Sequence, residues 1–129
     1  MRALRVALYT LLVFLCVACG GNFEIQADLS QAIYVTVLPQ ARSESSWSIS
    51  PGTPEHARLT AWLRANKFGW SNYYATNPKG GLFVSAGDWS LQFLDGSVIA
   101  CAIGRSCVWK NVPVSEYDFL LLSRPKSVA

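Results

Sequence analysis

Apolar and polar residues alternate most clearly in Trp89–Phe93, which is the pattern of a strand with one buried face. Asp95-Gly96 follows and favours a two-residue hairpin turn that returns the chain through Ser97–Ile103. The predicted register has three opposed pairs: Leu94 with Ser97, Phe93 with Val98, and Leu91 with Ala100. One face of this hairpin then collects the apolar side chains Trp89, Leu91, Phe93, Val98, Ala100 and Ala102.

The spacing of apolar residues changes to a helical period after Thr53-Pro54-Glu55. Thr53 suits a helix N-cap, Pro54 the first helical position, and Glu55 the positive end of the helix dipole. One helix face carries Leu59, Trp62 and Leu63. We therefore expect a helix over 54–67, ended by Gly69, that packs on the Trp89/Leu91/Phe93 face.

The remaining β-branched and aromatic stretches predict further strands at 33–38, 70–76, 82–86, 108–110 and 117–122. Gln40–Gly52 is rich in Ser and reads as a loop, in which Trp47 is expected to fold back onto the domain. The predicted fold is α+β, an antiparallel sheet of about five or six strands with one helix on one face. It forms a single domain over residues 31–123, with a disordered tail over 124–129.

The first residues have the organisation of a secretory signal peptide. Two arginines precede the apolar run Val6–Ala18, and small residues follow it. The run is too short for an ordinary transmembrane helix, so we predict a signal peptide over residues 1–18.

Val17-Ala18-Cys19-Gly20 resembles the lipobox of bacterial lipoproteins, although Cys16 stands where Leu is usual. The resemblance implies that Cys19 becomes the first mature residue and carries acyl groups, with residues 19–30 as lipidated Cys and tether. With Gly20 after the Cys, it also implies a cell-envelope location, lipid-anchored in the outer membrane and facing the periplasm. An ordinary cleaved signal is the alternative, because Cys16-x-Ala18 also fits a small-x-small cleavage site.

The cysteine count agrees with lipidation. Cys16 leaves with the signal and Cys19 is acylated, so Cys101 and Cys107 remain to pair. A five-residue loop between two adjacent strands places them opposite each other, and the periplasm is oxidising. We predict a Cys101–Cys107 disulfide.

Charge argues against a nucleic-acid partner. Removal of Arg2 and Arg5 with the signal lowers the formal net charge from +3 by two, to +1. A nucleic-acid binder needs a concentrated basic patch instead.

No residue pattern predicts catalysis, a metal or a cofactor. The single histidine, His56, falls in the first turn of the predicted helix and is expected to be solvated. Cys101 and Cys107 lack zinc-ligand spacing, and no Gly-x-Ser-x-Gly elbow is present. An acid/base pair would have to come from the carboxylates Asp88, Asp95, Glu116 and Asp118. We predict that the protein is not an enzyme, with a small hydrolase as an alternative.

A cluster of aromatic residues is the candidate binding site. Trp70, Tyr73 and Tyr74 lie in a stretch rich in amides, and such surroundings suit recognition of a protein or a glycan. Strand alternation would place Trp70 and Tyr74 on one face and Tyr73 on the other. Arg105, at the tip of the disulfide loop, is a further candidate contact. The alternative is that the rings cover the sheet.

These features favour a small non-catalytic protein-binding module on the envelope, such as an inhibitor or immunity-type lipoprotein. A structural or assembly lipoprotein within a resident envelope complex is the alternative. The partners expected are therefore the membrane, through the N-terminal lipid, and a protein.

Cys19→Ser should abolish incorporation of radiolabelled palmitate, because the serine hydroxyl cannot replace the thiol that receives the lipid. The wild-type protein should incorporate label and resist extraction by salt, since multiple acyl chains anchor stably. Absence of label in the wild-type protein would contradict lipidation.

Overall fold

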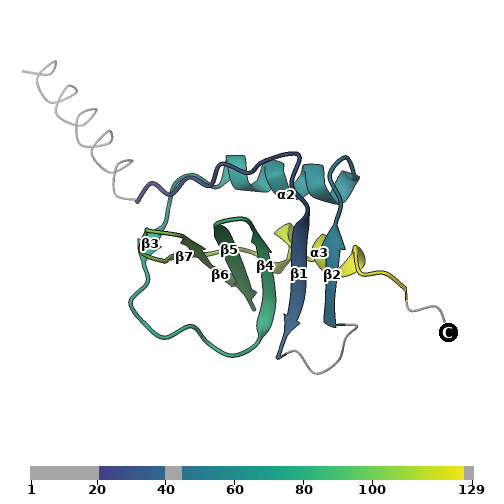
Figure 1. The fold of residues 1–129 in the computed structure, drawn as a ribbon. Helices are drawn as coiled ribbons and strands as arrows, with labels where there is room; N and C mark the ends of the chain where they lie inside the picture. Colours follow the sequence, from purple (N-terminus) through teal and green to yellow (C-terminus); the bar gives the residue numbers. More distant parts are fainter. Residues whose placement is uncertain (1–20, 40–44, 127–129) are drawn as a thin grey trace, which may run out of the picture.

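The computed structural model describes residues 21–39 and 45–126, which leaves the signal peptide, the lipobox and residues 127–129 of the tail outside the described residues. Seven strands form one antiparallel sheet in the order β2-β1-β4-β5-β6-β7-β3. A helix of twelve residues lies over one face of this sheet (Figure 1). The α+β class is confirmed, with seven strands rather than five or six.

The strands are β1 (Ile33–Leu38), β2 (Ser46–Ile49), β3 (Ser71–Asn72), β4 (Gly81–Ala86), β5 (Trp89–Leu94), β6 (Ser97–Ala102) and β7 (Val108–Asn111). The helices are α2 (Pro54–Ala65) and the short α3 (Phe119–Leu122), which follows a 3-10 turn at Val114–Glu116.

The β5–β6 hairpin has the predicted register. Phe93 pairs with Val98 and Leu91 with Ala100, around the turn at Asp95-Gly96. The helix packs on this hairpin as expected, and the rings of Trp62 and Phe93 meet edge-on with centroids 5.4 Å apart. The core therefore lies between α2 and the centre of the sheet.

Capping sets both ends of α2. The Thr53 hydroxyl accepts a bond from the backbone N–H of His56 at 3.3 Å, as the N-cap prediction requires. At the other end, both the backbone N–H and the side-chain amide of Asn66 donate to the carbonyl of Trp62. Asn66 itself leaves helical geometry, with φ −109° and ψ 53°, so the helix ends at Ala65 rather than at residue 67.

The prediction of a final strand over 117–122 is wrong. The chain makes a 3-10 turn after Pro113 and continues into α3. Tyr117 is stacked on Phe93 with centroids 4.5 Å apart, and its hydroxyl donates to the carbonyl of Leu94. The segment is rich in apolar residues because Tyr117, Phe119 and Leu120 fill the core. Leu122, by contrast, is 83% exposed.

Two other parts of the sheet differ from the prediction. The Ser-rich stretch expected to be a loop contains β2, in which Trp47 is buried and donates its ring N–H to the Ser123 hydroxyl at 3.0 Å. Residues 40–44 of that stretch lie outside the described residues. The strand expected over 70–76 has only the two residues of β3, because the chain leaves the sheet after Asn72.

Leu91→Ala should destabilise the protein by about 2–5 kcal/mol, because it leaves a cavity beneath α2 at a fully buried position. Leu122→Ala is the matched control, at an exposed position, and should change stability by less than about 0.5 kcal/mol. Urea unfolding followed by circular dichroism measures both. Similar losses in the two variants would contradict this placement of the core.

Candidate binding surfaces

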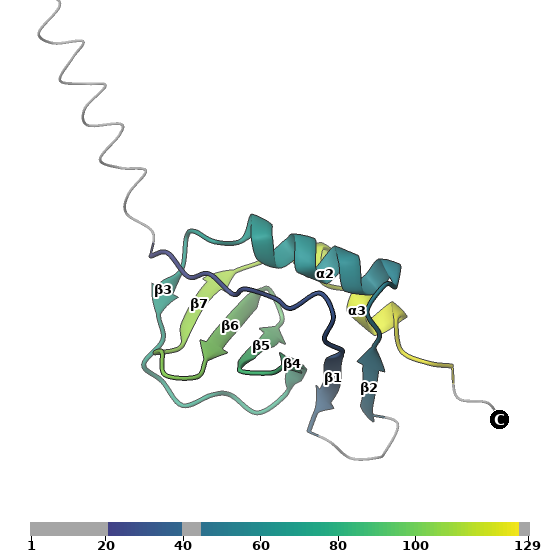
Figure 2. The ribbon, with the colours of Figure 1, turned by 45° about the horizontal axis from the view of Figure 1, so that its top comes forward.

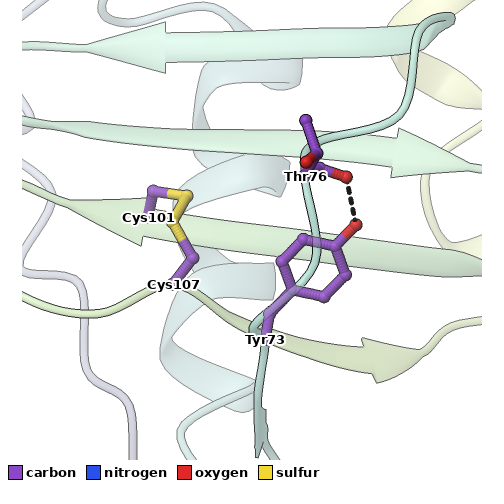
Figure 3. The surroundings of a disulfide bond; sticks show 4 residues. All are labelled: Tyr73, Thr76, Cys101 and Cys107. Carbon is purple, nitrogen blue, oxygen red and sulfur yellow. Dashed lines mark hydrogen bonds between the residues drawn. A yellow bond between two sulfur atoms is a disulfide. The ribbon is translucent and has the colours of Figure 1, made fainter.

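The predicted disulfide is present between Cys101 and Cys107, with an S–S distance of 2.07 Å and Cα atoms 4.4 Å apart. Figure 3 shows it beside Tyr73, whose backbone N–H donates to the carbonyl of Cys107 at 3.0 Å. The Tyr73 hydroxyl donates in turn to the carbonyl of Thr76 at 2.9 Å. The short loop closed by the disulfide corresponds to about 2 kcal/mol in the chain-entropy model.

Trp70, from the predicted aromatic set, belongs to the core. Its side chain is buried, and its ring N–H donates to the carbonyl of Asn66 at 2.7 Å. The ring of Phe23 lies 5.7 Å away, and the Lys110 ammonium is 5.3 Å from the indole. Because its ring is buried in these contacts, Trp70 is not available to bind a ligand.

Arg105 fastens the N-terminal segment to the hairpin. Its guanidinium lies 4.7 Å from the centre of the Phe23 ring and donates to the carbonyl of Glu24 at 3.1 Å. The Glu24 carboxylate pairs with Lys67 at 3.2 Å, and the Phe23 N–H donates to the Lys67 carbonyl. Within residues 19–30, predicted as lipidated Cys and tether, Gly21, Phe23 and Glu24 contact the domain.

Tyr74 is the one ring of the predicted set that is fully on the surface, with 88% of the residue exposed. Tyr73 is half-buried. The expectation that Trp70 and Tyr74 share one face is wrong, because the strand ends at Asn72 and alternation stops there.

His56 is buried rather than solvated, which corrects the sequence expectation. Its Nε2 atom lies 2.8 Å from the carbonyl of Gln31. The turn that carries Gln31 is stabilised by Asp28, whose carboxylate accepts bonds from the Ser30 hydroxyl and N–H. These bonds lower the pKa of Asp28. His56 thus joins the helix start to the N-terminal segment, which sequence alone does not reveal.

The candidate carboxylates are dispersed. Glu116 accepts the ring N–H of Trp62 at 3.0 Å, and Asp95 occupies the β5–β6 turn. Asp88 lies with Glu24 and Arg105 at an open hollow of about 490 Å³ between the N-terminal segment and the β6–β7 hairpin. Glu24 and Asp88 therefore line the same hollow as the Arg105 guanidinium, which donates to the backbone carbonyl of Glu24.

Sequence reasoning missed a second surface, the sheet face turned away from α2. Among the seven described strands the only charged side chain is Lys110, and its ammonium lies on the helix side, near Trp70. The described strands therefore present no charged side chain on the opposite face. Over β2, β1 and β4 it carries the hydroxyl and aromatic side chains Tyr34, Thr36, Ser46, Ser48, Phe83 and Ser85.

Among residues 21–39 and 45–126, only half of this face has no other segment across it. The loop over residues 73–80 crosses the other half, and the buried Gln92 amide donates to the carbonyls of Pro78 and Gly80 at 2.7 and 2.8 Å. The free half lies over β2, β1 and β4, where Tyr34 is 59% exposed. We call it the open half-face. The absence of charged residues in 33–38 and 81–86 could have indicated an uncharged sheet face. The extent of that face could not be predicted, because β2 was not predicted as a strand.

Within residues 21–39 and 45–126, no three His, Cys, Asp or Glu side chains are grouped to hold a metal ion. No helix in the same residues is long and apolar enough to cross a membrane. Comparison of the chain with protein-family models, curated proteins and solved structures gives no match.

Trp70→Ala should lower stability by about 3–5 kcal/mol, because it removes a buried ring that carries a hydrogen bond. Tyr74→Ala should leave the melting temperature nearly unchanged, since its ring is exposed. Thermal unfolding of the two variants tests the assignment. A heavy loss in Tyr74→Ala would mean that this ring is part of the core.

Proposed function

We propose that the protein is an envelope lipoprotein, anchored through Cys19, whose domain is a non-catalytic protein-binding module of the inhibitor or immunity type. The observation that carries the proposal is the open half-face, an uncharged sheet surface with an exposed Tyr34 among hydroxyl groups. The lipobox at Val17–Gly20 supports the anchor, and its Gly20 favours the outer membrane, with the domain in the periplasm. The disulfide suits that oxidising compartment.

The chemistry of the open half-face favours a protein partner. Tyrosine brings a large contact area at low entropic cost, and serine and threonine hydroxyls adapt as donors or acceptors. The Thr36 and Ser46 hydroxyls are an example: their oxygens lie 3.1 Å apart across the β1–β2 pair, and either one can be the donor. Removal of such a surface from water costs no desolvation of charged groups.

The edge strand β2 also favours a protein partner. Natural sheet edges are often blunted by a short edge strand, by lysine or proline, or by an inward-pointing charge, which prevents pairing with another chain. The strand β2, Ser-Trp-Ser-Ile, is short, with four residues, but has no lysine, proline or charge. An edge of this kind suits a partner that docks beside or across β2.

Tyr34→Ala should weaken capture of the partner by about 30-fold, equivalent to about 2 kcal/mol, as expected for an interface hot spot. Ser48→Lys should weaken it as well, since it places an unpaired charge on the same surface. Cross-linking pull-down from the envelope with the lipidated protein first identifies the partner, and binding to the purified partner then gives the change in Kd. Both variants should keep the wild-type melting temperature, because positions 34 and 48 are exposed.

Tyr74→Ala is the matched control, because it removes an exposed tyrosine outside the open half-face. Equal loss of binding in Tyr34→Ala and Tyr74→Ala, or no loss in either, would contradict the proposed surface. A foreign or secreted partner supports an inhibitor, whereas a resident complex indicates an assembly role. Turnover of an envelope substrate by the purified protein would contradict a non-catalytic module.

A further inference from the structure

The described chain begins at the β3 edge of the sheet. The N–H of Gly21 donates to the carbonyl of Trp70 at 2.9 Å, and the N–H of Trp70 donates back at 3.3 Å. Figures 1 and 2 both show the start of the described chain beside β3, whereas the C-terminal segment leaves on the opposite side, beyond β2. Position 21 is thus fixed on one side of the molecule.

The distance from this point to the anchor is short. Cys19 precedes Gly21 by two residues, which span at most about 7 Å when extended. If Cys19 carries lipid, as the proposed function holds, the β3 edge lies at the surface of the bilayer.

Three exposed aromatic residues flank this edge. Phe68 precedes Trp70 by two residues and is 65% exposed, Trp109 is paired with Ser71, and Tyr74 follows β3 by two residues. Aromatic side chains of this kind are enriched where proteins meet the lipid headgroups, because the ring enters the apolar boundary while its polar atoms stay hydrated.

The charge beside the exit is also suitable. Three cations, Lys67, Arg105 and Lys110, contact the exit segment or the indole of Trp70, whereas the carboxylates beside them are Glu24 and, at the hollow shared with Arg105, Asp88. An excess of positive charge at this position is attracted to anionic headgroups.

We propose that the domain rests on the bilayer through the β3 edge, with Phe68, Tyr74 and Trp109 in contact with the lipid headgroups. The sheet order places β2 at the opposite edge, six strand spacings or about 29 Å away. The open half-face therefore lies at the end of the sheet farthest from the membrane, where a partner in the surrounding space can reach it. This inference rests on the proposed lipid anchor.

Two matched cysteine variants report the orientation. Ser71→Cys and Ser48→Cys each replace an exposed serine, one in β3 and one in β2, while the native cysteines stay paired. Each variant is purified with its lipid, labelled with an environment-sensitive fluorophore and bound to phosphatidylethanolamine–phosphatidylglycerol vesicles. A fraction of these lipids carries a headgroup nitroxide, which quenches at close contact. We expect strong quenching at position 71 and little at position 48.

Phe68→Ser tests the aromatic contact, and Leu122→Ser is its control at an exposed position near the far edge. In the Ser71→Cys background, Phe68→Ser should reduce quenching toward the value at position 48, and Leu122→Ser should leave it unchanged. Equal quenching at positions 71 and 48, or an unchanged signal in Phe68→Ser, would overturn the proposal.

Flotation of the same samples with vesicles separates the two hypotheses. Protein that floats but shows equal quenching at both positions retains the anchor and loses the orientation. Protein that does not float, and whose N-terminal peptide has no acyl mass, overturns the proposed lipoprotein function and the orientation together.

Discussion

The fold depends on a cluster of three rings centred on Phe93. Trp62 of α2 meets this ring edge-on, and Tyr117 stacks on it from the C-terminal segment. Polar atoms of the two outer rings are satisfied close by, Trp62 by Glu116 and Tyr117 by the carbonyl of Leu94. Helix, sheet and C-terminal segment therefore converge at one buried position, and the other core contacts extend outward from it.

Sequence predicted those parts of the fold that depend on neighbouring residues. The β5–β6 register follows from alternation and a turn dipeptide, and the start of α2 follows from Thr53 and Pro54. The errors occur where a distant contact decides the structure. Trp47 belongs to a strand and bonds to Ser123, 76 residues away, and Tyr117 belongs to a turn because its ring fits against Phe93.

In the candidate site, too, local features were predicted and features that depend on distant contacts were not. The Cys101–Cys107 pair follows from hairpin geometry, which is local, and it was predicted. In sequence, Trp70 looks like a ligand contact because it begins an amide-rich stretch, and Arg105 because it lies at the tip of the disulfide loop. Their true partner is Phe23, which local pattern does not connect with either of them. The open half-face escaped prediction for a related reason, since it exists only when β1, β2 and β4 are placed side by side.

The contacts of residues 21–24 also determine how the protein responds to mechanical load. A pull on an anchor at Cys19 enters the fold at Gly21 and meets first the paired hydrogen bonds with Trp70. Beyond that pair, the tension divides between the segment that follows α2, through Lys67, and the β6–β7 hairpin, through Arg105. The Cys101–Cys107 disulfide closes that hairpin at its turn and links β6 to β7 covalently, so a load on Arg105 reaches both strands.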